Sequence, residues 1–237
     1  MAKVNLVRRA EIGQEKRART RAQLVAAACT LFSTRPSASV TIDDLVHEAG
    51  VAKGTFYVHF DDMHALTSAV ADELIRAFDD LLQPQRVATS DPLLRIALGC
   101  NAFIERALEE PAWGALVARM TRSYSKIGGT AQLRLREDLQ EALKQSPQPG
   151  LSVDLALEAV IGIILQVMTA IGEGRLSEKD RAGAVGVVLG AIGVGRQRAA
   201  STLAKLTRER AAPFHGESVA ASEIGEPRKK RAIKGQP

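Results

Sequence analysis

Apolar residues recur every three to four positions along most of this 237-residue chain, which is the spacing of one face of an α-helix. No segment shows the strict alternation of apolar and polar residues that is typical of a strand, and no hairpin signal is present. Aromatic residues make up only 4% of the chain, so the core must consist mainly of Ala, Leu, Val and Ile. Side chains of this kind favour closely packed helices. The sequence therefore predicts an all-α fold.

Proline, glycine and capping residues divide this pattern into separate helices. The first helix is expected from Lys16 to Ser33, and the residues before it are expected to be frayed. Pro84 is expected to close the fourth helix. The expected helices after the first cover residues 42–49, 51–60, 62–82, 91–110, 112–123, 130–145, 151–173 and 178–204.

Two of these helices are short and almost touch in sequence. Thr41 is suited to cap the first of them, with Asp44 three residues later as its partner in a capping box. Gly50 can take the left-handed conformation that ends a helix, and no other turn signal follows before Phe60. Two short helices joined by a tight glycine-containing turn predict a helix-turn-helix, in which the second helix enters the major groove of DNA.

The segment TIDDLVHEAGVAKGTFYVHFDDMHAL, residues 41–66, resembles the TetR family of bacterial transcription regulators. The resemblance is specific over roughly residues 17–70 and only architectural beyond them. It implies an N-terminal three-helix domain with a helix-turn-helix, followed by a larger helical domain for ligand binding and dimerisation. The closest matches are Ala26–Ala28, Leu31-Phe32, Ala49-Gly50-Val51, Gly54-Thr55-Phe56-Tyr57, His59-Phe60 and Leu66.

The same resemblance implies which residues touch DNA, and their chemistry agrees with it. Lys53 can donate to guanine, and Gly54 allows the backbone to approach closely. Positive charge in the first helical turns, at residues 16–21, suits an external anion. Purely structural roles stay open for these residues. Thr41 can cap a helix without touching DNA, and the others can be ordinary surface residues. The expected DNA-binding set is Thr41, Lys53, Gly54, Thr55, Tyr57, His59, Arg17 and Arg21.

Charge divides the chain into a weakly acidic body and two basic ends. The net charge is +5: residues 1–60 carry nine Lys/Arg against five Asp/Glu, and residues 205–237 carry eight against four. This layout suits one domain that meets nucleic acid and another that does not. The expected divisions are a flexible basic arm (1–15), a helix-turn-helix domain (16–61), a helical effector-binding and dimerisation domain (62–210) and a disordered basic tail (211–237). The tail's Arg228–Arg231 run either touches phosphate or only aids solubility.

The family architecture also implies a ligand cavity and a dimer interface. Mostly apolar side chains in the middle helices suit a small hydrophobic effector, although each can equally be ordinary core. The candidates are Phe103, Trp113, Met120, Tyr124 and Met168. The last two long helices, 151–173 and 178–204, are expected to form a homodimer, with intrachain packing as the alternative. Their stripes are Leu155, Ala159, Ile163 and Val167 in one, and Ala184, Val188, Ala191 and Gly195 in the other.

Other classes of site lack a sequence signal. The four histidines do not form a metal-binding pattern, and no nucleophile motif or phosphate-binding loop is present, so we expect no enzyme, metal or cofactor. Cys29 and Cys100 are expected to be buried thiols. No signal peptide and no apolar run of the length that spans a membrane are found, so a cytoplasmic location follows by default.

The functional expectation is a dimeric regulator, most simply a repressor, that binds an inverted-repeat operator in double-stranded DNA. A small, mostly hydrophobic effector would release it. The alternative is a non-specific or architectural DNA-binding protein that uses both basic ends. A helical enzyme or carrier is a third reading, and it lacks any acid, base or nucleophile cluster.

Two departures from the family pattern generate a prediction. Ala52 stands where the family often has a Ser or Thr cap, and Met63 stands where it usually has a lysine that contacts phosphate. We predict that Met63→Lys tightens binding to duplex DNA and steepens its salt dependence by about one unit, because one more phosphate is neutralised. Titration at several salt concentrations measures both, and an unchanged affinity and slope would contradict the prediction.

Overall fold

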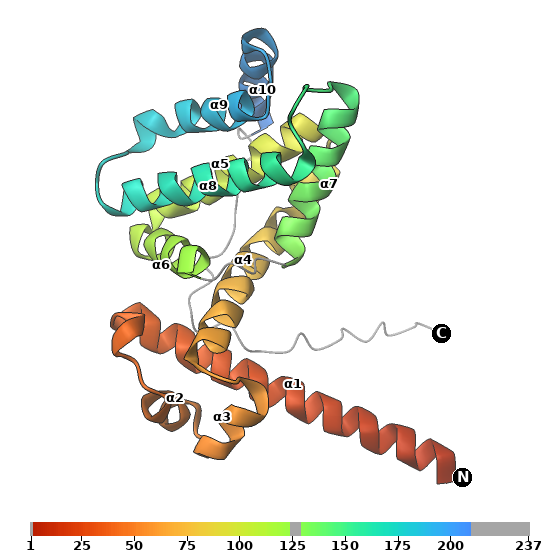
Figure 1. Cartoon of the computed structure of the whole chain (residues 1–237), viewed down its shortest axis with the longest axis vertical. Coiled ribbons are helices and arrows are strands. Elements are labelled where there is room, and N and C mark those ends of the chain that lie inside the picture. Colours follow the sequence, from red (N-terminus) through yellow and green to blue (C-terminus); the bar gives the residue numbers. More distant parts are fainter. Residues whose placement is uncertain (1, 124–128, 210–237) are drawn as a thin grey trace, which may run out of the picture. The chain divides into compact units, whose positions relative to one another are not determined.

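The computed structural model describes residues 2–123 and 129–209, and every regular element within these ranges is a helix (Figure 1). The prediction of an all-α fold is therefore confirmed. Two compact units divide the chain, one ending at Leu66 and the other beginning at Thr67. Tyr124 and the basic tail lie outside the described residues.

The first unit is built on a long helix, α1 (Ala2–Thr34), which packs on α2 (Ile42–Ala49). A 3-10 turn, η1 (Ser37–Ser39), lies between them, and α3 (Lys53–His59) follows α2 and packs on it. The core of this unit comes from all three helices, because amphipathic helices this short are stabilised by burying one face. Its most deeply buried side chains include Leu24, Ala28, Leu45 and Phe56.

The first helix begins at Ala2, so the expected start at Lys16 was wrong. Ala2–Glu15 contains no proline and only Gly13 as a glycine, and its Ala, Arg, Glu and Gln residues favour the helix. Apolar periodicity begins only at Leu24, where the helix gains a core to cover. A search for an apolar face therefore missed the earlier turns.

The second unit is a helical bundle centred on α8 (Val153–Gly172), which packs against α5, α6, α7 and α9. One side of α8 is buried through residues that include Leu157, Val160 and Met168. The other helices are α4 (Met63–Val87), α5 (Pro92–Glu109), α6 (Pro111–Ser123), α7 (Thr130–Gln145), η2 (Glu178–Asp180), α9 (Arg181–Ala191) and α10 (Arg196–Glu209).

Pro84 lies inside α4, which continues to Val87, so the expected end at this proline was wrong. Proline removes one backbone hydrogen bond and usually ends or kinks a helix. Here the turn after it carries Arg86, whose side chain is buried and bonded to Asp79 and Asp138. These contacts hold the last turn in place.

The expected helix 178–204 is two helices, α9 and α10, separated at Ile192–Gly195. Gly193 has a φ of 79°, a left-handed conformation that a helix cannot contain. The break turns the chain so that α10 packs on α5 and α9. Of the two helices that replace the expected helix 178–204, only α9 packs against α8 as the predicted pair of long helices requires.

By length and composition alone, α8 is apolar enough to cross a membrane, so the expectation that no stretch is long enough was wrong for this helix. It is the one such helix among the described residues. A core helix of a bundle meets the same criteria, and α8 packs against four other helices of its own chain.

The contact between α5 and α6 requires a glycine. A Cβ at Gly114 would lie 2.7 Å from the Cβ of Ala107 and 3.1 Å from its Cα. We predict that Gly114→Ala lowers the free energy of unfolding by about 1–3 kcal/mol, because the two helices must separate. Gly99→Ala in α5 is the matched control, since its Cβ meets nothing within 4 Å. Urea unfolding followed by circular dichroism measures both, and equal stability of the two variants would contradict the prediction.

Candidate nucleic-acid interface and ligand cavity

The turn between α2 and α3 is formed by a single left-handed residue. Gly50 has φ 64° and ψ 34°, and its N–H donates to the carbonyl of His47 at 3.1 Å. The N–H of Val51 donates to the carbonyl of Val46 at 3.0 Å. Both bonds satisfy carbonyls at the end of α2, as in a Schellman motif. The chain is thereby free to start α3 at Lys53.

The start of α2 is fixed by the expected capping box. The N–H of Asp44 donates to Thr41 Oγ1 at 3.2 Å, and the N–H of Thr41 donates to Asp44 Oδ2 at 2.9 Å. Arg35 lies 3.3 Å from Asp44 Oδ1. Hydrogen bonds from the Thr41 backbone and hydroxyl, followed by Arg35, lower the pKa of Asp44. Thr41 is thus engaged as a cap, apart from the other candidates on α3.

The helix α3 has one buried side and one exposed side. Phe56 is fully buried and Phe60 nearly so, with their ring centroids 5.9 Å apart. Tyr57 is 53% exposed, although the edge of its ring contacts Phe56. Lys53 and Gly54 are also exposed, and Thr55 is half-buried. The aromatic anchor therefore presents three of the expected contact residues to solvent.

Lys53 is not alone on this surface. Its Nζ lies 2.9 Å from Asp43 Oδ1 and 3.1 Å from Oδ2, and both side chains are exposed. The hydrogen bond to Asp43 and its negative charge raise the pKa of Lys53, so the ammonium stays protonated. This pair joins residues ten apart across the turn, and it was not predicted from the sequence. The ion pair with Asp43 must therefore open, or Lys53 must keep it while donating a second hydrogen bond, before Lys53 contacts another acceptor.

No close contact among the described residues explains why position 54 is a glycine. A Cβ at this position would meet nothing within 4 Å, and its φ is not positive. The neighbouring Ala52 caps α3 without a side-chain hydrogen bond, as its residue type predicts. By contrast Asp62 Oδ1 accepts a hydrogen bond of 2.7 Å from the N–H of Ala65 at the start of α4.

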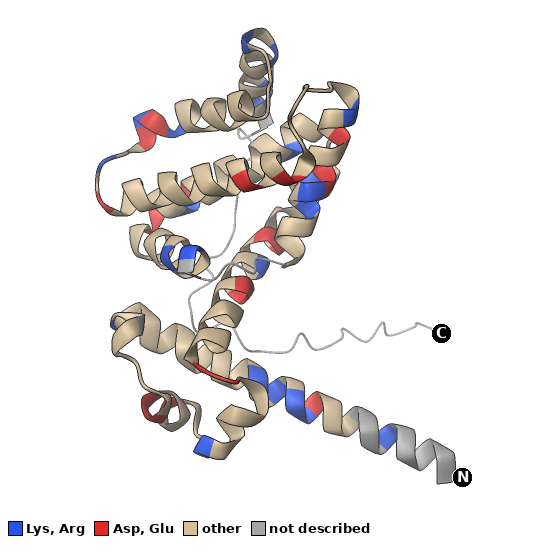
Figure 2. Ribbon diagram, viewed as in Figure 1, with Lys and Arg blue, Asp and Glu red and all other residues tan. Residues whose placement is uncertain are grey.

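Three further residues of the expected DNA-binding set, His59, Arg17 and Arg21, lie near one another at the end of α3. Burial, followed by the positive charges of Arg17 and Arg21, lowers the pKa of His59 below its usual 6.5. The guanidinium of Arg21 lies 4.9 Å from the centre of the Phe60 ring, a cation–π contact. In the ribbon of Figure 2, positions occupied by Lys or Arg recur along α1 and stand at the start of α3. At pH 7 the neutral His59 is thus flanked by two arginines of α1.

The second unit contains a cavity of about 120 Å³ between α4, α5, α6, α7 and α8. Phe103 and Met168 line it, as expected. Trp113 instead packs against Phe103, with ring centroids 6.1 Å apart, and Met120 is buried in the core away from the lining. The fifth candidate, Tyr124, lies outside the described residues. Helical periodicity identified the buried face, but it did not separate cavity wall from core.

Among the described residues, Cys29 and Cys100 form no disulfide, and both are buried, as expected. Cys100 lines the cavity, where burial raises the pKa of its thiol to about 12. The thiol is therefore neutral, and it offers the cavity a small apolar surface rather than a nucleophile.

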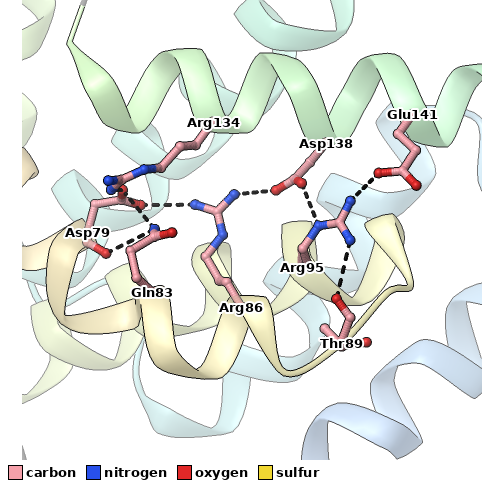
Figure 3. A network of polar contacts seen from close by, with 8 residues as sticks. All are labelled: Asp79, Gln83, Arg86, Thr89, Arg95, Arg134, Asp138 and Glu141. Carbon is pink, nitrogen blue, oxygen red and sulfur yellow. Dashed lines mark hydrogen bonds and ion pairs between the residues drawn. The ribbon is translucent and has the colours of Figure 1, made fainter.

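An ionic network forms part of the cavity wall, and the sequence analysis missed it (Figure 3). Arg86 lies 3.1 Å from Asp79 and also pairs with Asp138, and all three side chains are buried. Arg95 Nε lies 2.6 Å from Asp138, and Arg134 pairs with Asp79. Because each buried charge has a partner, α4, α5 and α7 are held together at this point. The available signal was spacing: Asp79 and Arg86 lie two helical turns apart on α4.

Part of the chain matches known proteins in sequence. Residues 24–70 match the family model described as bacterial regulatory proteins, tetR family. The transcriptional regulator EthR of Mycobacterium tuberculosis is 31% identical over 84 residues, which cover 35% of this chain and 39% of EthR. TtgR of Pseudomonas putida is 37% identical over 68 residues, covering 29% of this chain and 32% of TtgR. The matches thus span about two fifths or less of these relatives.

Solved structures match over a greater length. RolR in complex with resorcinol has a TM-score of 0.57 and 22% identity, covering 81% of this chain and 96% of RolR. FadR from Bacillus subtilis in complex with stearoyl-CoA has a TM-score of 0.51 and 16% identity, covering 73% and 98%. At these identities the likeness shows a shared fold.

The pair formed by Lys53 and Asp43 generates a prediction about DNA binding. Asp43→Asn removes a negative charge from this surface and releases Lys53, so we expect binding to duplex DNA to become about two- to fivefold tighter. Fluorescence anisotropy at fixed salt measures the change. Asp154→Asn is the matched control, because Asp154 is equally exposed and pairs with Arg136 in the second unit. Weaker binding of Asp43→Asn, or an equal effect of the control, would contradict the prediction.

Proposed function

Since this chain belongs to the TetR family of bacterial regulatory proteins, we propose that it is a sequence-specific transcription regulator that binds an operator through α3. The observation that carries the proposal is the division of α3 into two sides. Phe56 and Phe60 anchor the helix, and Lys53, Gly54 and Tyr57 are left exposed. A helix so held can enter a major groove without rearranging its own core.

Within this proposal the exposed residues have separate tasks. Lys53 and Thr55 lie in the first turn of α3, and they read base edges, with Lys53 donating to guanine O6 or N7. Tyr57, His59, Arg17 and Arg21 hold phosphates, which position the protein without specifying sequence. Gly54 allows the close approach, since the chain itself does not require a glycine there. Thr41 contributes mainly through its cap, which orients α2.

The regulator acts as a homodimer in this proposal. A reading helix of seven residues covers few base pairs, and two-fold symmetry doubles the site into an inverted repeat. The side of α8 that its own chain leaves uncovered carries Leu155, which is 54% exposed, with Ala159, Ile163 and Val167 half-buried. In α9 the expected stripe was wrong at Val188, which is fully buried in its own chain, and Val187 is instead 59% exposed. Helix α9 packs beside α8. Apolar side chains left at the surface of two adjacent helices support a dimer interface there.

A small, mostly hydrophobic effector bound in the cavity would control DNA binding. Helix α4 begins directly after the helix-turn-helix, and its Ile75, Asp79 and Arg86 line the cavity. A ligand that favours one position of α4 therefore biases the spacing of the two reading helices in the dimer. RolR and FadR were solved with ligands of very different size, so the fold alone does not identify the effector. We propose that the protein is a repressor located in the cytoplasm, together with the operator DNA. The proposal includes no catalytic step.

Selection of genomic fragments by the full chain tests the proposal. We expect the enriched fragments to share an inverted repeat, and we expect the complex to survive an excess of random DNA, with a preference of at least about 1,000-fold. A non-specific or architectural protein would enrich no common motif and would lose its fragment to random DNA. That result would contradict the proposal.

Gly54→Ala separates DNA contact from folding. A Cβ at Gly54 meets nothing in the chain, so the free energy of unfolding should stay the same or rise by up to about 1 kcal/mol. Affinity for the selected fragment should fall by about tenfold or more, because the methyl group blocks the approach of the backbone to the groove. Unchanged affinity in Gly54→Ala would exclude a close approach at this residue.

A further inference from the structure

Two buried polar atoms on residues that line the cavity have no hydrogen-bond partner among the described residues. They are Oγ1 of Thr121 in α6 and Oε1 of Gln132 in α7. Thr121 is only 5% exposed, so water at the protein surface does not reach its hydroxyl freely. Folded proteins pair nearly all buried polar atoms, because an unpaired one keeps its full desolvation cost. Two such residues on one cavity indicate a ligand that pairs with them.

The size of the cavity limits that ligand. Its volume of about 120 Å³ is close to that of apolar protein cavities that hold one benzene ring. Most of the wall is aliphatic or aromatic, so a ring or a compact hydrocarbon body is favoured over a polar one. The apolar wall includes Ile75, Ile96, Phe103, Val117, Leu135, Val160 and Ile164.

The charges around the cavity argue against a charged ligand. Among its described lining residues, the carboxylates of Asp79 and Asp138 balance the guanidiniums of Arg86 and Arg95. Each of these charges already has a partner: Arg86 pairs with both carboxylates, and Arg95 pairs with Asp138. A charged ligand would lose its hydration and find no free counter-ion. Cys100 does not change this balance, because its buried thiol is neutral.

The chemistry of the two unpaired atoms specifies the polar group of the ligand. The amide oxygen of Gln132 only accepts, so the ligand must donate to it. The hydroxyl of Thr121 both donates and accepts. A hydroxyl group on the ligand satisfies both requirements with one oxygen atom.

We propose that the effector is an uncharged phenol or cyclic alcohol of about one ring, whose hydroxyl group bonds to Gln132 and Thr121. The inference rests on the proposed function, since it names the ligand class of the cavity assigned there to the effector. The ring lies among the aliphatic and aromatic residues, and the hydroxyl faces Thr121 of α6 and Gln132 of α7.

Calorimetric titration of the full chain with phenol, benzene and benzoate tests this assignment. We expect phenol to bind at least about tenfold more tightly than benzene, since up to two hydrogen bonds are gained, and benzoate to bind more weakly than phenol. In the double variant Thr121→Val with Gln132→Met, the ratio of phenol to benzene affinity should fall to about one. Retained benzene binding in this variant shows that the cavity is intact.

Thr202→Val is the matched control. Thr202 is 3% exposed, its hydroxyl donates to the carbonyl of Arg198 at 3.0 Å, and it does not line the cavity. This variant should keep the preference for phenol. The inference is overturned if phenol and benzene bind equally to the unmodified chain, if the preference survives in the double variant, if benzoate binds more tightly than phenol, or if none of the three binds.

The same proteins are titrated with the selected operator fragment, so that the two proposals fail separately. Specific DNA binding without any preference for phenol overturns the ligand assignment alone. Phenol binding in a chain that never binds DNA specifically overturns the proposed regulator, and it leaves the cavity assignment standing. Phenol binding that does not release the operator overturns the effector role of this ligand class.

Discussion

The left-handed conformation of Gly50 is the constraint on which the helix-turn-helix depends. A residue with a Cβ is strained at a φ of 64°, whereas glycine is not. The turn ends α2 at Ala49 and allows α3 to start at Lys53, with the carbonyls at the end of α2 still satisfied. Burial of Phe56 and Phe60 then sets the rotation of α3. The exposed side of the helix follows from these two conditions, and with it the residues that a DNA groove would meet.

In the second unit the corresponding constraint is electrostatic. Arg86 is buried between Asp79 and Asp138, so it connects α4 to α7 beside the cavity. Removing one partner from such a group leaves an unpaired buried charge, which typically costs about 3–5 kcal/mol. The network therefore fixes one wall of the cavity, and within the part of the chain that the structure describes, Thr121 Oγ1 and Gln132 Oε1 have no hydrogen-bond partner. Helix α4 belongs both to this wall and to the segment that follows the helix-turn-helix, so the proposed link between ligand binding and DNA binding is assigned to this helix.

The parts of the fold that the sequence predicts well are those set by local interactions. The bounds of α2 agree with prediction because Thr41, Asp44 and Gly50 act within their own turns. The early start of α1, the passage of α4 through Pro84 and the break at Gly193 were missed. At Pro84 the contacts of Arg86 with Asp79 and Asp138 override the local signal. At Gly193 the left-handed glycine is itself a local stop, which the apolar pattern on either side concealed. The early turns of α1 precede the apolar stripe from which that helix was predicted.

In the candidate site too, features set within one helix were predicted, and features set by several helices together were not. Of the candidates on α3, Lys53, Gly54 and Tyr57 are exposed, whereas Thr55 and His59 are half-buried. The pair of Lys53 with Asp43 depends on the angle between two helices, which the sequence does not show. In the cavity, Phe103 and Met168 were identified, whereas Trp113 and Met120 belong to the surrounding core. Spacing along one helix shows which side is buried, and it does not show where several buried sides leave a gap. The contacts proposed with DNA remain predictions.

Hydroxyl-radical footprinting of the full chain on its selected fragment tests the central claim most directly. A dimer that places one α3 in each of two adjacent major grooves predicts two protected patches on the same face of the duplex. Their centres should lie about one helical turn, roughly 34–36 Å, apart, and the sequences under them should be related by a two-fold axis. Continuous protection along the fragment, or protection that does not depend on its sequence, would contradict the account.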